Sequence, residues 1–224
     1  MSAQTATVLI VDDDASFLRS LERLIGTAGY RVSAYDRASD FLKSRLPKGP
    51  KCLILDLQMP GIDGLDLQRE LATRGLLLSV IFLSGHGDVP SSVQAMKLGA
   101  LDFLTKPVRG EILLAAVRAA LEKDKARGKD EKDVEAIRRR IETLSSREHE
   151  VFRWVIAGRL NKQTAYEMGI SEKTVKFHRA RVMQKMEAQS VAELTVLAGR
   201  AGVAPMRKVG LRPRRGPKTP VLIS

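Results

Sequence analysis

One stretch of the sequence decides the fold: residues 52–61, which read CLILDLQMPG. A single carboxylate, Asp56, lies inside a short apolar run that ends at Pro60 and Gly61, the pattern of a buried strand that meets a loop. An ionised carboxylate at such a place is costly unless it meets a metal ion, a cation or several hydrogen bonds. Asp56 therefore either caps the turn after the strand or takes part in chemistry.

The segments around this run alternate between apolar strands and amphipathic helices. We expect strands at residues 7–11, 31–35, 52–57, 78–83 and 101–104, and helices at residues 17–28, 38–46, 64–74, 89–98 and from about residue 108. Apolar strands that alternate with helices predict a doubly wound α/β domain, in which helices cover both faces of a parallel sheet.

Polar side chains stand where these strands end. Asp12 and Asp13 follow the first strand, Asp56 lies at the third, Ser84 at the fourth and Lys106 at the fifth. Ligands of such sheets bind beyond the carboxyl ends of the strands. Clustered carboxylates repel one another unless a hard cation is present, and a few oxygen ligands with room for water suit Mg²⁺. The set predicts a phosphoryl-receiving site with Asp as nucleophile, Mg²⁺ and Lys neutralising phosphoryl oxygens, and Ser donating a hydrogen bond.

Four motifs, in this order, resemble the receiver domain of two-component response regulators: Val11-Asp12-Asp13, residues 56–61, Ser84-Gly85-His86 and Lys106-Pro107. The similarity covers roughly residues 5–122 and implies a flavodoxin-like fold with a five-stranded parallel sheet. It implies that Asp56 accepts a phosphoryl group from the phosphohistidine of a sensor histidine kinase.

The same resemblance assigns the residues around Asp56. Asp13, Asp56 and the backbone carbonyl of Gln58 would bind Mg²⁺, with Asp12 acting through water.

Ser84 takes the position of the switch hydroxyl, where Thr is more usual, and Lys106 pairs with the phosphoryl group. Phe103 resembles the switch aromatic that turns inward, and a plain core aromatic is the alternative. His86 is interpreted as a loop residue.

The charged residues divide the chain into two halves. Residues 1–121 carry 14 Lys and Arg against 13 Asp and Glu, whereas residues 122–224 carry 24 against 13. This asymmetry predicts a half that binds a polyanion, with nucleic acid the first candidate and an anionic membrane the second. Cys52 is expected to be a small core residue. Without a leader pattern or an apolar run of roughly 18 residues, the protein is expected to be cytoplasmic.

The joint between the halves is almost purely charged over residues 122–133, where Gly128 interrupts it. Beyond it, apolar residues recur at three- and four-residue steps, at Val134, Ile137, Ile141 and Leu144. Such a seam either pairs with a second copy or docks as a single helix on a domain.

The second half carries the pattern of a helix-turn-helix. Ser145 and Glu148 form a capping-box start. A short helix at residues 162–168 and a turn with Gly169 precede a longer basic helix at residues 172–186 that Ser171 caps, and a further helix is expected at residues 191–201. A short helix, a turn with Gly and a longer basic helix are typical of a DNA-binding unit.

Residues 144–151, 157–158, 161–162 and 170–178 resemble the LuxR-type helix-turn-helix, and residues 179–186 resemble its FixJ branch. The resemblance implies base-facing positions for Lys176, Phe177 and Ala180. It implies phosphate contacts for Lys162, Lys173, Thr174 and His178, and dimer contacts for Val191, Leu194, Thr195 and Ala198. His178 is alternatively a packed helix residue, and Thr164 stands where the family commonly has a branched apolar residue.

Together the resemblances predict a receiver domain (residues 1–122), a charged helical linker (123–140), a LuxR-type DNA-binding domain (141–202) and a basic tail (203–224) for which disorder is the default. The expected protein is a regulator of the NarL/FixJ type that uses Mg²⁺, a sensor kinase, double-stranded DNA and RNA polymerase as partners, and that dimerises when Asp56 is phosphorylated.

Two rival functions are weighed against this prediction. One is a DNA binder whose receiver is only structural, which the complete acidic pocket disfavours. The other is a Mg²⁺-dependent aspartyl-phosphate hydrolase. It is disfavoured because in those enzymes the nucleophile directly follows the first strand, whereas Asp56 lies on the third. The protein is therefore not expected to be an enzyme.

Overall fold

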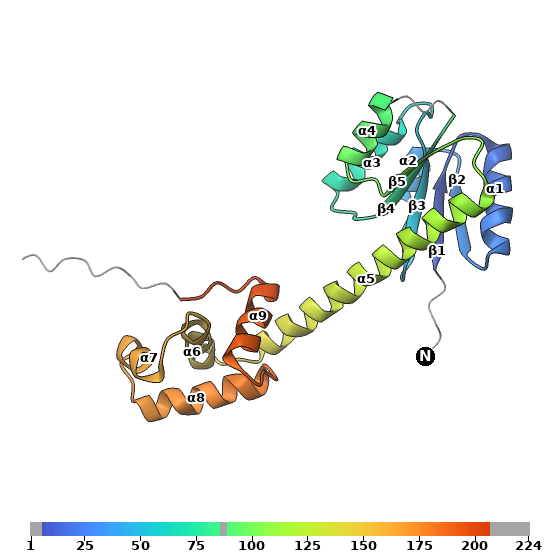
Figure 1. Cartoon of the computed structure of the whole chain (residues 1–224). Coiled ribbons are helices and arrows are strands. Elements are labelled where there is room, and N and C mark those ends of the chain that lie inside the picture. Colours follow the sequence, from blue (N-terminus) through green and yellow to red (C-terminus); the bar gives the residue numbers. More distant parts are fainter. Residues whose placement is uncertain (1–5, 86–88, 207–224) are drawn as a thin grey trace, which may run out of the picture. The chain divides into compact units, whose positions relative to one another are not determined.

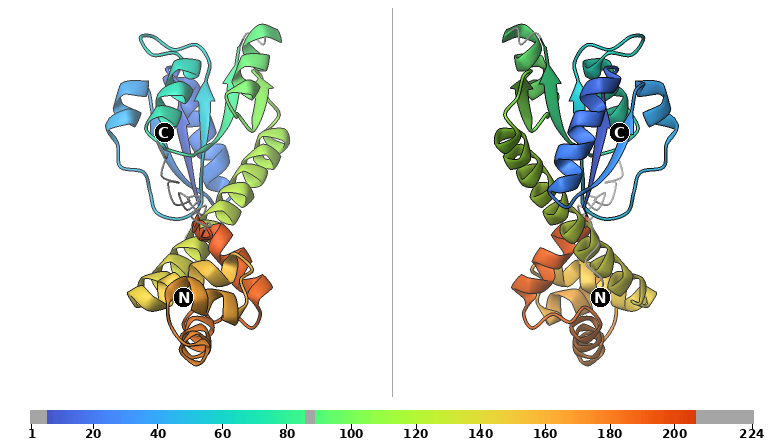
Figure 2. Two further views of the ribbon diagram at one scale, coloured as in Figure 1. Left: turned by 90° about the vertical axis from the view of Figure 1, so that its left-hand side faces the viewer. Right: turned by 90° about the vertical axis from the view of Figure 1, so that its right-hand side faces the viewer.

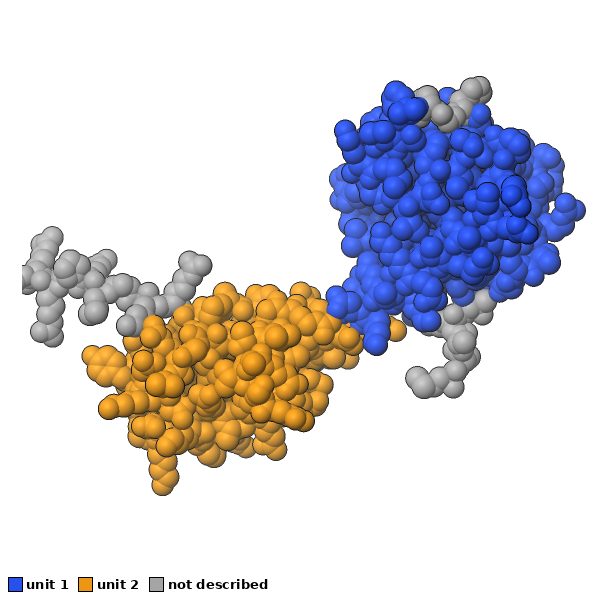
Figure 3. Space-filling view, in the orientation of Figure 1, with its two compact units in different colours: residues 1–131 blue, residues 132–224 orange. Residues whose placement is uncertain are grey.

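The computed structural model describes residues 6–85 and 89–206. The chain divides into two compact units, residues 1–131 and residues 132–224 (Figure 3). Within the described ranges, no helix combines the length and the apolarity that crossing a membrane requires.

Unit 1 contains a five-stranded parallel sheet in the order β2-β1-β3-β4-β5 (Figure 1). Its strands are β1 (Thr7–Val11), β2 (Arg31–Tyr35), β3 (Lys51–Asp56), β4 (Ser79–Ser84) and β5 (Asp102–Thr105). The helices are α1 (Ala15–Thr27), α2 (Ala38–Lys43), α3 (Gly64–Thr73), α4 (Val89–Lys97) and α5 (Gly110–Glu142). This is the flavodoxin-like strand order, so the predicted fold class is confirmed.

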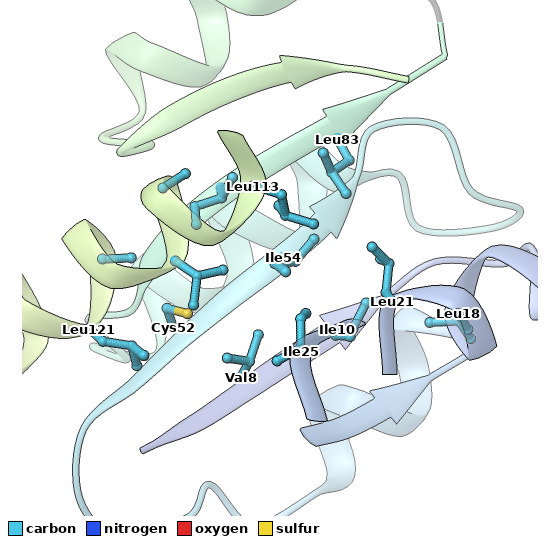
Figure 4. Packing of buried hydrophobic residues seen from close by; sticks show 14 residues of the cluster. Val8, Ile10, Leu18, Leu21, Ile25, Cys52, Ile54, Leu83, Leu113 and Leu121 are labelled. Carbon is cyan, nitrogen blue, oxygen red and sulfur yellow. The ribbon is translucent and has the colours of Figure 1, made fainter. Parts of the chain in front are cut away.

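The sheet is buried between two helical layers (Figures 1 and 2). Alternate side chains of one strand point to opposite faces, so Ile54 packs with α1 and α5, and Leu55 packs with α2, α3 and α4. Figure 4 shows the first layer, in which Leu21 of α1 and Leu113 of α5 lie over the strands. Cys52 is fully buried in the same layer, as predicted, and burial raises the pKa of its thiol to about 12.

One predicted helix of unit 1 ends earlier than expected. The apolar spacing predicts a helix through residue 46, whereas α2 ends at Lys43. Ser44 adopts an extended backbone, and both its N–H and its hydroxyl donate to the carbonyl of Phe41. This local bonding satisfies the carbonyl group of Phe41 in the last turn and ends the helix.

The charged joint is one continuous helix. α5 runs for 33 residues and passes through Gly128 without a break. A glycine in a helix interior costs only about 1 kcal/mol relative to alanine, which the surrounding helix formers offset. Asp124, which is 5% exposed, anchors the helix because its carboxylate accepts a hydrogen bond of 3.0 Å from the backbone N–H of Lys51 and pairs with Arg127.

Unit 2 consists of the last turns of α5 and of α6 (Ser146–Ile156), α7 (Asn161–Met168), α8 (Glu172–Lys185) and α9 (Val191–Ala201). Ile137 is buried in the core of this unit, and Ile141 and Leu144 pack against it. Of the two interpretations of the apolar seam, the structure therefore shows docking on a domain of the same chain. The capping box of Ser145 and Glu148 is present as predicted.

Candidate functional site

The carboxyl-terminal edge of the sheet holds a group of three charges. The ammonium nitrogen Nζ of Lys106 lies 2.6 Å from Oδ2 of Asp12 and 2.8 Å from Oδ1 of Asp56. The two carboxylate side chains are only 2% and 8% exposed. Lys106 thus brings together side chains that follow three different strands, as the rule for parallel sheets predicts.

Local backbone bonds orient the two carboxylates. The backbone N–H of Gln58 donates to Oδ2 of Asp56 at 2.9 Å, and that of Asp14 donates to Oδ1 of Asp12 at 3.0 Å. Gly64 opens α3 directly against this site. A Cβ atom at Gly64 would stand 2.2 Å from the carbonyl oxygen of Asp56, so only glycine allows the approach.

Burial and pairing act on the charges in opposite directions. Burial raises the pKa of the Asp12 carboxyl, and the hydrogen bonds from Lys106 and from the N–H of Asp14 offset only part of that rise. For Lys106, burial lowers the pKa, but the hydrogen bonds to Asp12 and Asp56 outweigh it and the pKa is raised. Lys106 is therefore a fixed cation at this edge.

The structure does not place Asp13 in the same group. Asp13 is exposed, and its neighbour Asp14 caps α1 by accepting from the N–H groups of Ser16 and Phe17. In the part of the chain that the structure describes, no three acidic, His or Cys side chains lie close enough to hold a metal ion. The two carboxylates that do converge, those of Asp12 and Asp56, meet on the ammonium group of Lys106.

The predicted switch residues lie on β4 and β5. Ser84 is 1% exposed at the end of β4, and its carbonyl accepts a 2.7 Å hydrogen bond from the N–H of Lys106. Phe103 is half-buried and its ring stacks on that of Phe82 at 6.1 Å between centroids. His86 lies outside the described residues.

Sequence reasoning missed one contact of the site. Nζ of Lys106 lies 4.3 Å from the ring centroid of Phe17, a cation–π distance. Phe17 is part of the apolar stripe of the first predicted helix, so no sequence signal separates it from an ordinary core residue.

Unit 2 presents a helix-turn-helix formed by α7 and α8. Gly169 ends α7 with a φ of +64°, and the Ser171 hydroxyl caps α8 by accepting from the N–H of Thr174. Val175 and Val182 are buried. The outer face of α8 exposes Lys173, Lys176, Phe177 and Ala180, and Lys162 is exposed on α7.

Two of the residues predicted to contact phosphates, Thr174 and His178, already contact other side chains of unit 2. The Thr174 hydroxyl lies 2.7 Å from that of Ser171, so it is already used at the helix start. His178 is half-buried, its ring meets that of Phe177 edge-on at 5.6 Å, and its Nδ1 is buried without a hydrogen-bond partner among the described residues. Thr164 is 1% exposed and occupies the position of a core residue in spite of its hydroxyl.

A buried ion pair between Glu148 and Lys185 joins α6 to α8. The sequence predicted the role of Glu148 in the capping box but not its pairing with Lys185. Lys185 Nζ lies 2.6 Å from Oε2 of Glu148, whose side chain is 4% exposed. That hydrogen bond, together with one from the N–H of Ser145, lowers the pKa of Glu148 to about 2. The capping box predicts the contact with Ser145, whereas the contact with Lys185 spans 37 residues.

The predicted dimer contacts on α9 need a correction. Leu194 and Ala198 are 0% and 1% exposed because they belong to the core of unit 2. Their side chains have no surface left for a direct contact with a second copy. Thr195 is exposed, Val191 is half-buried, and Val196, which was not predicted, is 62% exposed.

Fold and sites together define a class: a receiver-type α/β domain followed in the same chain by a helix-turn-helix domain. Two family models match the chain, the response regulator receiver domain over residues 8–118 and the bacterial regulatory proteins of the luxR family over residues 142–198. The chain therefore belongs to the two-component response regulators that carry a LuxR-type DNA-binding domain. Its relatives are transcriptional regulators and not enzymes.

The chain is similar over most of its length to regulators of the FixJ group, as predicted. It is 44% identical to nodulation protein W of Bradyrhizobium diazoefficiens, covering 89% of this chain and 88% of the relative. It is 43% identical to the transcriptional regulatory protein FixJ of Azorhizobium caulinodans, covering 90% and 96%. The solved structure of the response regulator StyR matches with a TM-score of 0.76 and 39% identity, covering 88% of this chain and 99% of that one.

Proposed function

We propose that this regulator is switched by phosphorylation of Asp56 and that the phosphorylated form binds promoter DNA as a dimer. The observation that carries the proposal is the convergence of Asp12, Asp56 and Lys106 at the edge of the sheet. A buried carboxylate beside a fixed cation is placed to receive an anionic group.

The proposed transfer follows from the position of the Asp56 carboxylate. One of its oxygens attacks the phosphorus of a phosphohistidine on the sensor kinase, the P–N bond breaks, and the imidazole leaves with its electron pair and takes a proton. Lys106, which already lies 2.8 Å from Oδ1 of Asp56, neutralises charge on the phosphoryl oxygens. The hydroxyl of Ser84 donates a hydrogen bond to the product.

Mg²⁺ is the proposed cofactor of this site. Asp12 and Asp56 supply carboxylate oxygens, the hard ligands that Mg²⁺ prefers, at the same edge of the sheet. Asp12, Asp13, Asp56 and the carbonyl of Gln58 are proposed to hold the ion, with the exposed Asp13 turning toward it. Bound Mg²⁺ would neutralise the transferring phosphoryl group and so offset the repulsion between anions.

The proposed readout is a change of surface on α4 and β5. Movement of Ser84 and Lys106 toward the phosphoryl group, with Phe103 turning inward, would shift an existing equilibrium. Three apolar side chains of α4 support this surface as a contact between copies, since Val89, Val93 and Met96 are 73%, 45% and 49% exposed.

A dimer would present two helix-turn-helix units to a two-fold DNA site. Lys176, Phe177 and Ala180 are proposed to face the bases, and Lys162, Lys173, Thr174 and His178 to hold phosphates. On α9, Val191 and Thr195 stay candidate contacts between copies, and the exposed Val196 takes the place of the buried Leu194 and Ala198. RNA polymerase is the proposed further partner, and the cytoplasm the proposed location.

The switch is tested with a small acyl-phosphate donor or beryllium fluoride in the presence of Mg²⁺. Mass, oligomeric state and retention on DNA are followed for wild type, Asp56→Asn and a control, Asp40→Asn, which changes an exposed acid on α2. Wild type and the control are expected to gain the phosphate or its mimic, to dimerise and to bind DNA more tightly. DNA binding that ignores Asp56 would overturn the switch and leave a DNA binder with a structural receiver.

A further inference from the structure

An aromatic side chain is exposed on the outer face of α8. Phe177 is 57% exposed, while the other large apolar side chains of the helix, Val175, Val182 and Met183, are buried or half-buried. A phenyl ring left in water gives up the stabilisation that burial would supply. The fold of unit 2 therefore does not account for an aromatic residue at this position.

The contacts of the ring hold it at the surface. The guanidinium carbon of Arg181 lies 5.4 Å from the ring centroid of Phe177, and Nε of Arg181 lies 3.9 Å from the buried carboxylate of Glu148. The ring of His178 meets that of Phe177 edge-on at 5.6 Å. Ala180 lies one turn further on the exposed face and adds only a methyl group.

We propose that Phe177 is a specificity-determining residue that reads the 5-methyl group of a thymine in the major groove. The inference rests on the proposed DNA binding by α8. Phe177 stands in the first half of the second helix of the motif, the part that meets base edges in helix-turn-helix proteins. A phenyl ring neither donates nor accepts a conventional hydrogen bond, and among the four bases only thymine presents a methyl group in that groove.

The test isolates the methyl group from every hydrogen-bonding atom of the base. The full chain, treated with beryllium fluoride and Mg²⁺, selects duplexes from a random double-stranded DNA library. Each thymine of a selected duplex is then replaced in turn by deoxyuridine, which lacks only the 5-methyl group. At one position of each half-site the replacement is expected to weaken wild-type binding about four-fold, the factor that corresponds to one methyl group leaving water.

Three variants assign the effect to the ring. Phe177→Ala is expected to bind the thymine and deoxyuridine duplexes equally, and Phe177→Leu to keep most of the difference. Tyr166→Ala removes another exposed aromatic residue, 87% exposed on α7, and is expected to keep the full difference. A cytosine at the same position is expected to bind better when it carries a 5-methyl group, in wild type but not in Phe177→Ala. Circular dichroism checks that the variants are folded.

The possible outcomes distinguish a failure of this inference from a failure of the proposed DNA binding. A selection that enriches no sequence would overturn the proposed DNA binding and the inference with it. Sequence-specific binding in which no thymine is sensitive to the loss of its methyl group would overturn the inference alone. The same conclusion would follow if Phe177→Ala kept the wild-type sensitivity.

Discussion

At the scale of single residues, a lysine pairs with buried carboxylates in each unit. Lys106 pairs with Asp12 and Asp56 in unit 1, and Lys185 pairs with Glu148 in unit 2. A buried carboxylate without its cation is strongly destabilising, because the charge keeps its desolvation cost and loses its partner. The first pair lies at the proposed phosphorylation site, whereas the second holds two helices together.

The pair in unit 2 predicts a dependence of stability on pH. The pKa of Glu148 falls from 4.5 to about 2 on folding, so the stabilisation is complete above pH 4.5 and is lost as pH falls toward 2. The Glu148 side chain is only 4% exposed, so water screens the ion pair little. The full pKa shift therefore counts toward stability and corresponds to about 3 kcal/mol of unfolding free energy. Glu148→Gln is expected to destabilise unit 2 by about that amount at pH 7 and to flatten the acid limb of the stability curve.

Trp154, the single tryptophan, lies in α6 and reports unfolding of unit 2 in urea at several pH values. The control is Glu150→Gln, which removes a partly exposed pair with Arg147 and is expected to cost no more than about 0.5 kcal/mol. Equal effects of the two substitutions at pH 7 would contradict the role of the buried pair.

At the scale of elements, the close approach of α3 to β3 supports the proposed acceptor. Gly64 lets the first turn of α3 lie against the backbone of Asp56, with its N–H donating to the carbonyl of Leu57 at 2.9 Å. The Asp56 carboxylate thus projects from the end of β3, where pairing with the neighbouring strand and the contact with α3 both fix the backbone.

Gly64→Ala is therefore expected to destabilise unit 1 by about 2 kcal/mol, because the added Cβ overlaps the carbonyl oxygen of Asp56 and forces the backbone to shift. Phosphorylation of Asp56 is expected to slow in the same variant. Hydrogen exchange at β3 and β4, read by mass spectrometry, measures the loss.

The matched control is Gly26→Ala in α1, where an added Cβ meets nothing within 4 Å. It is expected to leave unit 1 unchanged or to stabilise it by up to about 1 kcal/mol. Faster exchange in this control than in Gly64→Ala would show that the contact with Asp56 is unimportant.

At the scale of the whole molecule, the division of charge follows the division of function. Residues 122–224 carry 24 basic and 13 acidic side chains, and six of the basic ones lie beyond Met206, where no acidic residue occurs. The segment before them is anchored on α6, since the N–H of Met206 donates to the carbonyl of Arg153 and Nε of Arg153 donates to that of Ala204.

Deletion of residues 207–224 is expected to make DNA binding less dependent on salt without changing site preference. Each lost phosphate contact lowers the slope of log affinity against log salt by about 0.9. Affinity for one selected duplex and one unrelated duplex is measured between about 50 and 200 mM salt, a range over which phosphate contacts make the affinity strongly dependent on salt. A chain with the six basic residues changed to Gln is the control of equal length, and an unchanged slope in both would exclude phosphate contacts by the tail.

Much of this architecture was determined by local sequence. Continuous apolar runs and helical spacings, together with Gly and Ser at element ends, predicted all five strands and placed Asp12, Asp56, Ser84 and Lys106 at one edge of the sheet. The capping box at Ser145, the turn at Gly169 and the cap at Ser171 likewise predicted the helix-turn-helix. These features depend on residues a few positions apart, and such short-range preferences are readable from the chain.

Only the tertiary structure decided which side chains meet across long separations. The pairs Lys106 with Asp12, Lys51 with Asp124 and Lys185 with Glu148 span 94, 73 and 37 residues. Packing also buried Leu194 and Ala198 and docked Ile137 on unit 2, where the apolar spacing alone left the partner open. A pattern marks a residue as apolar or charged. Its partner depends on which elements pack together, a property of the whole fold.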